Sequence, residues 1–570
     1  MSREWRTGLV AAALALFCAV ASFNHTKPGP NVWSRIGPAI NLADHGTLEL
    51  KEFGELTHDK RIINEREFSD KAPGSIFIAS LIYGLFFKVT GISKSLSADQ
   101  VRYLVSTLIL GLSAVFILEF MSRILKTESI KFPSYFASVA YVLSAPVFAY
   151  HIVYFGHALA ALFVLIALTF AISEPTNVNG AFFTGLFFGL ATVVEYPVLI
   201  LGIWASLLFL RGGLKNFLVY AFALLFFSVV PIALYNWYCF GAPFSFGYSQ
   251  VFLPYYRERM ARGFFGFTYP SLKNLWLLTF SNARGLFFWG PAFFAGFVGL
   301  ILGIVRNAAR KKLYIWSLLG FLIYLILFSS YHEASGGVAF GPRHLLPALV
   351  FLALGWPEFW HGGRAFARTL LVLWIFGAAV SLIFVGAEPL LPAGIKNPAV
   401  EFYPLVLKNN WIIDNWGRYI GIGGAWSLVV PLIFFVVAFV GAWRVDADAL
   451  KQREAATSKS IPLAHAVFAL IILLIVLQTV FVRSDKANLH VELADYHFAW
   501  KRWSVAESEY TLAAQYRKNP YIYYYLSLAR IELGDYDGAL KAVEESYKLG
   551  PDQYLTFKLR RLENWLKAVQ

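Results

Sequence analysis

Residues 31–74, NVWSRIGPAINLADHGTLELKEFGELTHDKRIINEREFSDKAPG, form a polar segment around which the rest of the chain is organised. The segment is dense in Asp, Glu, Lys, Arg and His, whereas long apolar runs precede and follow it. It ends in SDKAPG at residues 69–74, where an acid and a base stand directly before an apolar run. Ionisable side chains held against a membrane are costly and usually functional, so we expect the chemistry of this protein here.

The composition around this segment is that of an integral membrane protein. Of the 570 residues, 58% are hydrophobic and only 15% are charged, against about 25% in soluble domains. The 53 Phe, 29 Tyr and 17 Trp suit lipid-facing helices with aromatic belts at the interfaces. We attribute the net charge of +14 to basic cytoplasmic loops and expect no nucleic acid partner. Cys18 and Cys239 lie in or beside apolar runs, and two cysteines indicate neither a disulfide framework nor a cysteine-based metal site.

Apolar runs separated by polar breaks predict an all-α, polytopic membrane protein with about thirteen transmembrane helices. These runs lie at residues 8–23, 101–121, 133–150, 157–173, 181–194, 196–210, 216–235, 285–304, 312–330, 345–360, 369–387, 426–443 and 462–482. Several are short for a hydrocarbon core about 30 Å thick. The neighbours 181–194 and 196–210 are weak spans singly and could form a tight hairpin.

The run at residues 74–90, GSIFIASLIYGLFFKVT, determines the predicted topology. If it spans the membrane, loop 122–131 lies outside and every later loop inverts. If it lies in the interface, the short basic loops, including 122–131, 306–312 and 444–459, fall on the cytoplasmic side, as the positive-inside rule requires. We therefore expect an interfacial helix, a cytoplasmic N-terminus and an extracytoplasmic C-terminus.

The first apolar run has a second interpretation. Arg3 and Arg6, an apolar stretch and the AVA sequence at residues 19–21 resemble a signal peptide with its cleavage site. We expect the segment to be retained, because cleavage would detach the anchor that frames the polar segment.

The composition becomes soluble after residue 483, so we divide the chain into two domains. Residues 1–483 form the predicted transmembrane domain, with an extracytoplasmic loop and its interfacial helices at 24–100, and residues 484–570 form a small extracytoplasmic helical domain. The second domain has a spacing that resembles a tetratricopeptide repeat at Tyr523, Leu526, Gly534, Tyr536, Ala539 and Pro551, with a looser copy at Trp503, Ala506, Tyr510, Ala513 and Pro520. Two repeats are fewer than such arrays normally need alone, so we expect a cap on the membrane domain or a docking site for a protein partner.

The adjacent acid and base Asp70 and Lys71 are the first candidates for chemistry. They precede an expected helix start near Pro73, where free backbone amides and the helix dipole favour an anion. Lys71 adds a point charge, and this combination suits a lipid phosphate. The alternative is a solvated pair where the loop meets the lipid headgroups.

Five further residues stand at expected interfacial turns or in the polar segment. Glu195 lies between two apolar runs, where a carboxylate is costly unless it is paired or in a cavity, although it could simply end a helix at the surface. His157 opens an apolar run, as an active group or as a hydrogen-bonded cap. Arg343 and Arg35 could each hold a phosphate bidentately; otherwise Arg343 would snorkel to headgroups and Arg35 would lie on a helix face. Asp59 is one of several acids in the segment, most of which we expect to be solvated.

Several common motifs are missing from the sequence. It contains no Walker loop, no strand-borne GxGxxG, no HExxH and no cysteine cluster, which argues against soluble nucleotide or zinc chemistry. The spans also lack the charged residues and matched broken helices that an ion-coupled transporter needs.

These pieces together resemble the GT-C membrane glycosyltransferases, and more closely their branch of protein mannosyltransferases and aminoarabinose transferases. The chain looks like a bacterial subgroup with the loop pattern N-x-x-S-R, HGT and SDKAPG, here at Asn31, Ser34, Arg35, residues 45–47 and residues 69–74. Later agreeing pieces are YFGHALA, GLATVVEYP, YNWYCFGAPFSFGY, RGLFFWGP and GGVAFGPRHLLP. The resemblance covers about residues 1–440 and implies a location in the bacterial inner (cell) membrane.

The resemblance implies an inverting sugar transfer on the outer face of the membrane. A polyprenyl-phosphate sugar enters from the bilayer, and basic residues hold its phosphate. A loop carboxylate deprotonates a hydroxyl of a lipid, glycan or protein acceptor, which attacks the anomeric carbon. The leaving polyprenyl phosphate already carries charge, so its departure needs mainly cationic stabilisation. No cofactor is implied with certainty, and a divalent metal is not indicated.

The resemblance also assigns roles to the candidate residues. Lys71 matches the family lysine that meets the lipid phosphate, and Asp70 takes the acid position beside it. The early Asp-Glu pair that supplies the family's usual base falls near Asn31, which could orient an acceptor but cannot accept its proton. We therefore expect Asp70 to be the base, with Asp59 and Glu195 as alternatives. Candidates for holding the donor phosphate beside Lys71 are Arg343, Arg35 and His157.

Two other functional classes stay open at this point. A transporter or flippase of lipid-linked glycans would need polar residues along the spans, and these spans show few. A non-catalytic membrane scaffold that presents the tetratricopeptide tail would explain the missing Asp-Glu pair. Loss of glycosylation on replacing Asp70 and Lys71 would favour the enzyme over both.

Overall fold

The computed structural model describes residues 3–126, 130–174, 176–451 and 462–569. The protein is 74% helical, which confirms the expected all-α class. Seven described helices are long and apolar enough to cross a membrane. They are α1 (Arg3–Ala21), α4 (Ala98–Leu125), α7 (Gly156–Ser173), α10 (Leu214–Phe240), α15 (Lys311–Ser329), α18 (Arg364–Val380) and α22 (Val429–Val445). The last two reach spanning length with the helical turns that adjoin them, over Arg364–Val385 and Gly424–Val445.

Of the other six predicted spans, one is a bent pair, four are short helices, and one is a 20-residue helix whose continuous described apolar stretch is Ile472–Phe481. The run at 133–150 is a pair, α5 (Ser134–Val142) and α6 (Ala145–Ile152), bent by 61°. The remaining runs contain α8 (Val178–Val194), α9 (Leu199–Phe209), α14 (Pro291–Val305), α16 (Leu349–Ala353) and α24 (Pro462–Phe481). By length and composition the described residues therefore give seven spans, or eight if the bent pair is one.

Helices α8 and α9 form the tight hairpin that their short lengths suggested. A Cβ placed on Gly202 would lie 3.4 Å from Cβ of Phe188, so residues equally far from Glu195 meet across the two helices. Tyr220 of α10 donates to the carbonyl of Gly202 at 2.5 Å and holds the hairpin against a long helix.

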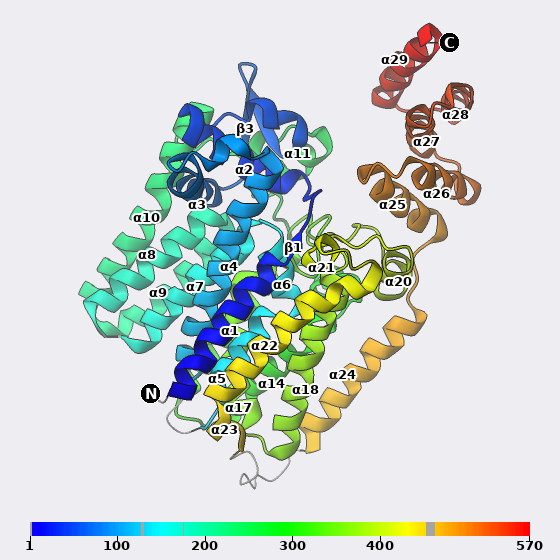
Figure 1. Cartoon of the computed structure of the whole chain (residues 1–570). Helices are drawn as coiled ribbons and strands as arrows, with labels where there is room; N and C mark the ends of the chain where they lie inside the picture. The colour runs from blue at the N-terminus through cyan, green and yellow to red at the C-terminus, as the bar shows by residue number, and fades with distance from the viewer. Residues whose placement is uncertain (1–2, 127–129, 175, 452–461, 570) are drawn as a thin grey trace.

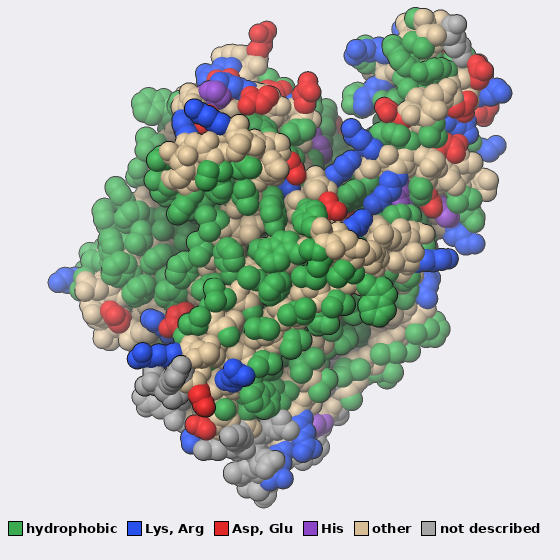
Figure 2. All heavy atoms as spheres, viewed as in Figure 1, with side chains coloured by type: hydrophobic (Ala, Val, Ile, Leu, Met, Phe, Trp, Pro, Cys, Tyr) green, Lys and Arg blue, Asp and Glu red, His purple; other side chains and the backbone are tan. Residues whose placement is uncertain are grey.

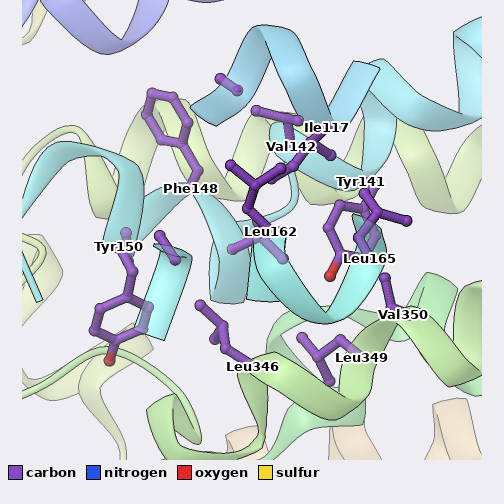
Figure 3. Close-up of a cluster of buried hydrophobic side chains, with 14 of the residues drawn as sticks. Ile117, Tyr141, Val142, Phe148, Tyr150, Leu162, Leu165, Leu346, Leu349 and Val350 are labelled. Carbon is purple, nitrogen blue, oxygen red and sulfur yellow. The ribbon is translucent and has the colours of Figure 1, made fainter. Parts of the chain in front are cut away.

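The short and long helices share one hydrophobic core (Figure 3). Its centre combines side chains of α4, α5, α6, α7 and the segment from η7 (Arg343–Ala348) into α16. The labelled members are Ile117, Tyr141, Val142, Phe148, Tyr150, Leu162, Leu165, Leu346, Leu349 and Val350. Tyr150 also donates to the carbonyl of Phe340 at 2.6 Å, so this core anchors the loop that leads to Arg343.

The helical bundle has two distinct ends (Figure 1). At one end Gly8 packs against the backbone of Gly441, and Arg310 donates to the carbonyls of Ile124 and Lys126 at 3.0 and 2.8 Å. The N-terminus and several basic loops therefore share this end, although residues 452–461 of the predicted loop 444–459 lie outside the described residues. Hydrophobic side chains cover the middle of the visible face and charged ones gather toward the ends (Figure 2).

The opposite end carries the polar segment and α3 (Gly74–Tyr83), which continues as a π-helical turn to Lys88. Tyr83 donates to Asp44 at 2.8 Å, and Arg102 at the start of α4 donates to Asn24 at 2.8 Å. The run at 74–90 thus leaves from and returns to the same end of the bundle. An interfacial helix requires this arrangement, because a membrane-spanning helix would place residues 74 and 90 at opposite ends of the bundle.

Two small sheets accompany the helices at this end. β1 (Phe23–Asn24) pairs with β4 (Asp414–Asn415), and β2 (Lys60–Ile63) pairs with β3 (Arg66–Ser69) in an antiparallel hairpin. Asn64 and Glu65 have φ of 48° and 64°, the left-handed conformation of a two-residue hairpin turn. We did not predict this hairpin, because its strands are rich in charge and its turn has no glycine.

Short elements connect these parts. They are α2 (Pro30–His45), α11 (Pro254–Met260), α12 (Leu272–Thr279), α13 (Leu286–Trp289), α17 (Trp356–Trp360), α19 (Pro398–Glu401), α20 (Tyr403–Lys408), α21 (Trp416–Tyr419) and α23 (Ala447–Lys451).

The C-terminal region consists of five helices beside the polar end of the bundle (Figure 1). They are α25 (Lys486–Ala499), α26 (Trp503–Tyr516), α27 (Pro520–Glu532), α28 (Tyr536–Lys548) and α29 (Gln553–Val569). Alternate helices begin at Lys486, Pro520 and Gln553, intervals of 34 and 33 residues. The pattern read around Tyr523 spans the pair α27 and α28, whereas the looser copy falls on α26 and the first residue of α27.

Candidate functional site

A cavity of about 550 Å³ lies at the polar end of the bundle. This volume is typical of a small-molecule or lipid headgroup site. All eight residues singled out from the sequence line it, although they come from five separate parts of the chain. They are Asn31, Arg35, Asp59, Asp70, Lys71, His157, Glu195 and Arg343.

Helix α2 brings Asn31 and Arg35 to the cavity together. Gly29, with φ of 81°, turns the chain into the helix, and Pro30 occupies its first position, where a missing N–H costs nothing. Asn31 and Arg35 are four residues apart, which places them on one face. Arg35 NH1 donates to the carbonyl of Asn31 at 3.0 Å and also to its side-chain oxygen.

The β2–β3 hairpin explains why Asp59 meets Lys71. Lys60 and Ser69 are paired across the strands, so the residues just outside this pair, Asp59 and Asp70, emerge side by side. Lys71 Nζ lies 3.0 Å from Asp70 Oδ1 and 3.3 Å from Asp59 Oδ2. One ammonium group therefore joins both ends of the hairpin.

A chain of polar contacts extends from this pair across the cavity. Asn31 Nδ2 donates to Asp59 Oδ2 at 3.3 Å, and Arg35 NH2 donates to Glu195 Oε1 at 3.2 Å. Nδ1 of His157 lies 3.5 Å from the same Glu195 oxygen. Seven of the eight predicted residues thus belong to one connected network, because Asn31 also contacts Arg35.

Close backbone approaches hold Glu195 in place. A Cβ on Gly156 would lie 2.4 Å from Glu195 Oε1, and a Cβ on Gly74 would lie 2.7 Å from Val194 Cγ2 and 2.8 Å from its nitrogen. The starts of α3 and α7 and the end of α8 therefore converge here, and the two glycines of the SDKAPG and YFGHALA pieces make this convergence sterically allowed.

Arg343 reaches the cavity from a different loop. Its guanidinium carbon lies 5.2 Å from the centre of the Phe155 ring, and Gly336, with φ of 78°, packs against its side chain. The Nε atoms of Arg343 and Arg35 are buried without a hydrogen-bond partner among the described residues. Such guanidinium groups have capacity left for an anionic ligand.

Buried Arg284 joins the two loops that form the mouth of the cavity. It donates to the carbonyls of Ser335 and Gly337 at 3.2 Å each, and to those of Leu391 and Pro392 at 3.3 and 3.0 Å. A guanidinium group can satisfy several carbonyls at once, which explains an arginine here.

Electrostatics distinguish the two aspartates. Burial raises the pKa of Asp70 to about 6, although Lys71 opposes the rise. Burial also works to raise the pKa of Asp59, but Lys71 and His58 outweigh it and hold this pKa below its usual range. Burial lowers the pKa of Lys71, but Asp59 and Asp70 outweigh it and raise this pKa, so Lys71 stays protonated. Asp70 is the aspartate suited to exchange a proton near neutral pH.

Glu195 is less suited to this role. Burial raises its pKa, with Arg35 opposing, so it shares the direction of Asp70. Its Oε1 atom, however, is already bound by Arg35 and faces His157. We therefore regard Glu195 as the group that orients Arg35.

Sequence reasoning missed several cavity residues. Tyr248, the last residue of the YNWYCFGAPFSFGY piece, places its ring 5.5 Å from Lys71 Nζ, and the preceding Gly247 packs against Asp70. His344 follows Arg343 and stacks on Phe328 with ring centres 4.9 Å apart. Tyr248 and His344 both lie within motifs noted in the sequence, although the sequence assigned no role to either residue.

The described part of the site contains no arrangement typical of a metal centre, and the chain matches no known protein family. Within the described residues, no group of three or more His, Cys, Asp or Glu side chains is arranged to hold a metal ion. No protein-family model and no curated protein matches the chain, so its function is argued from the geometry of the cavity.

Proposed function

We propose that this protein is a GT-C-type membrane glycosyltransferase. It moves a sugar from a polyprenyl-phosphate-linked donor to a lipid, glycan or protein acceptor at the outer face of the bacterial inner membrane. The observation that carries the proposal is the cavity in which Lys71 meets Asp70 and Asp59, while the buried Nε atoms of Arg343 and Arg35 have no hydrogen-bond partner in the described part of the chain.

In the proposed reaction the donor phosphate binds between Lys71, Arg343 and Arg35. Asp70 takes the proton of the acceptor hydroxyl, and the acceptor oxygen forms a bond to the anomeric carbon. The bond from that carbon to the phosphate oxygen breaks at the same time, and its electron pair stays on the phosphate. The three cations stabilise the negative charge that develops on the phosphate. Stabilisation of developing charge by such preorganised groups is usually the largest single contribution to catalysis.

The proposed topology follows from the two ends of the bundle. The basic loops around Arg310 share an end with the N-terminus, which the positive-inside rule assigns to the cytoplasm. The cavity and helices α25 to α29 then lie on the extracytoplasmic side of the membrane. If the bent pair, the four short helices and α24 also cross, the number of spans reaches the expected thirteen.

The test is a profile of lipid-linked sugars in cells that lack the protein. We expect one polyprenyl-phosphate sugar to accumulate, since its consumer is gone. Wild-type protein should restore the normal profile, and Lys71→Met should not. An unchanged profile in the deletion strain would contradict the proposal.

A further inference from the structure

Helix α25 of the C-terminal region forms one wall of the cavity. Four of its residues and the residue that caps its end line the space, at spacings that place them on a single helical face. This outer wall consists of Glu492, Asp495, Tyr496, Ala499 and the helix-capping Trp500. The facing inner wall consists of Asn31, Arg35, Asp59, Asp70 and Lys71.

Specific polar contacts fix the outer wall to the membrane domain. Tyr496 donates to Glu388 Oε2 at 2.9 Å inside the protein, and Lys27 Nζ donates to the carbonyl of Ala499 at 3.2 Å. Just before α25, the nitrogen and hydroxyl of Ser484 each donate to Glu401 at 2.7 Å. The helix is therefore held at both ends and cannot serve only as a distant docking platform.

Apart from the buried Tyr496, the side chains of the outer wall are accessible to a ligand. Asp495 and Ala499 are exposed, and Glu492 and Trp500 are half-buried. Behind them lies His25, which is only 2% exposed and donates from Nε2 to Glu388 Oε1 at 2.8 Å. Its Nδ1 atom has no hydrogen-bond partner among the described residues. The outer wall thus places accessible hydrogen-bond acceptors next to a buried imidazole nitrogen that is free to form a further hydrogen bond.

The chemistry of the two walls differs. The inner wall presents cations next to carboxylates, which suits a phosphate. The outer wall presents the carboxylates of Glu492 and Asp495, which can accept hydrogen bonds from hydroxyl groups, and the indole of Trp500. Lys27 Nζ and the guanidinium carbon of Arg502 lie 5.9 and 5.0 Å from the centre of that indole, so this wall carries charges of both signs around an aromatic ring. An aromatic face beside carboxylates fits the apolar face and hydroxyl edge of a neutral sugar ring.

Building on the proposed function, we propose that α25 forms the acceptor subsite and that this subsite binds a neutral, hydroxyl-rich glycan. The C-terminal helices then complete the site, with the donor phosphate at the inner wall and the acceptor at the outer wall. Trp500 stacks on a sugar ring, and Glu492 and Asp495 accept from its hydroxyls.

The experiment measures binding of two kinds of probe to the purified full-length protein. Maltotriose, mannotriose and chitotriose probe the outer wall, a polyprenyl phosphate probes the inner wall, and pentalysine tests for a basic peptide instead. We expect at least one trisaccharide to bind, with affinity at least tenfold lower in Trp500→Ala and Glu492→Gln. Polyprenyl phosphate binding should be unchanged in both variants, which also shows that they are folded.

Matched controls are available in the same region. Trp565→Ala in α29 and Glu544→Gln in α28 remove the same chemical groups away from the cavity and should leave trisaccharide binding unchanged. If Trp500→Ala is unfolded, Trp500→Phe replaces it and should lose a smaller part of the affinity.

The outcomes separate the two proposals. The acceptor subsite is refuted if no trisaccharide binds the wild type, if the variants bind as well as the wild type, or if pentalysine binds in place of the sugars. Failure of the wild type to bind polyprenyl phosphate would instead refute the proposed donor chemistry, whatever the trisaccharides do.

Discussion

The inner and outer walls line the same cavity but come from different kinds of structure in distant parts of the chain. The inner wall comes from one continuous loop, in which a hairpin and a helix N-terminus gather charged groups that compensate one another. Asp70 and Arg35 there are only 3% and 2% exposed. The outer wall is one face of a helix more than 400 residues later in the chain, and its charged groups are accessible. Buried, mutually compensating charges suit chemistry, whereas accessible carboxylates and rings suit recognition.

Replacement of the inner-wall base should have the largest effect. In Asp70→Asn we expect kcat/KM to fall by about a thousandfold, within the usual range for a general base. Because the pKa of Asp70 is raised to about 6, wild-type kcat/KM should fall as the pH drops below about 6, where Asp70 becomes protonated.

The pH profile of sugar transfer checks this prediction, and Asp59→Asn is the comparison. Asp59 has a lowered pKa, so its variant should retain the acid limb near pH 6. A wild-type pH profile without this acid limb, or a larger loss of kcat/KM in Asp59→Asn than in Asp70→Asn, would identify Asp59 as the base instead.

Replacement of Lys71, a cation of the inner wall, should have the second-largest effect. Lys71→Met should lower kcat about a hundredfold, since one stabilising donor to a developing charge contributes on this scale. It should also weaken polyprenyl phosphate binding, which no outer-wall variant should do. Lys94→Met, at an exposed position in the same loop at residues 24–100, is the control and should behave as wild type. Equal effects at both positions would indicate a general electrostatic role.

A steric change tests whether the inner wall depends on geometry as well as charge. A Cβ on Gly247 would lie 2.6 Å from the Cα atom of Asp70, so Gly247→Ala must displace backbone. We expect activity to fall about tenfold with a stability loss of about 1–3 kcal/mol, the usual range for overpacking. Gly423→Ala meets nothing within 4 Å and should be neutral in thermal unfolding and activity. Wild-type activity in Gly247→Ala would show that the wall adapts.

The smallest effect concerns the start of the outer-wall helix. Asp485 caps α25 by accepting from the nitrogen of Asn488 at 3.2 Å, and Asn519 caps α27 in the same way. Loss of either cap by substitution with Ala should cost about 1 kcal/mol. Hydrogen exchange should show the loss locally, and only Asp485→Ala should also weaken trisaccharide binding. Equal trisaccharide binding by the two variants would show that α25 does not take part in recognition of the sugar.

Much of the inner wall could be predicted from the sequence. Asp70, Lys71 and Arg35 stand out because charged residues beside an apolar helix start are unusual, and all eight proposed site residues line one cavity. Their functional roles stay predictions. The contact of Asp59 with Lys71 could not be predicted, because it depends on a short hairpin whose strands contain charged residues and whose turn has no glycine.

The sequence by itself determined the apolar helices, the polar segment between them and the soluble C-terminal helices. These features depend on local composition and periodicity, since burial of apolar groups and helix formation act over short stretches of chain. The tertiary structure alone decided that several apolar runs are short or bent, and that α25 faces Lys71 across one cavity. Contacts such as Tyr496 with Glu388 join residues 108 positions apart, and no local pattern specifies them. They form because closing such a distance costs little more chain entropy than closing a shorter loop, while the buried hydrogen bond favours one arrangement.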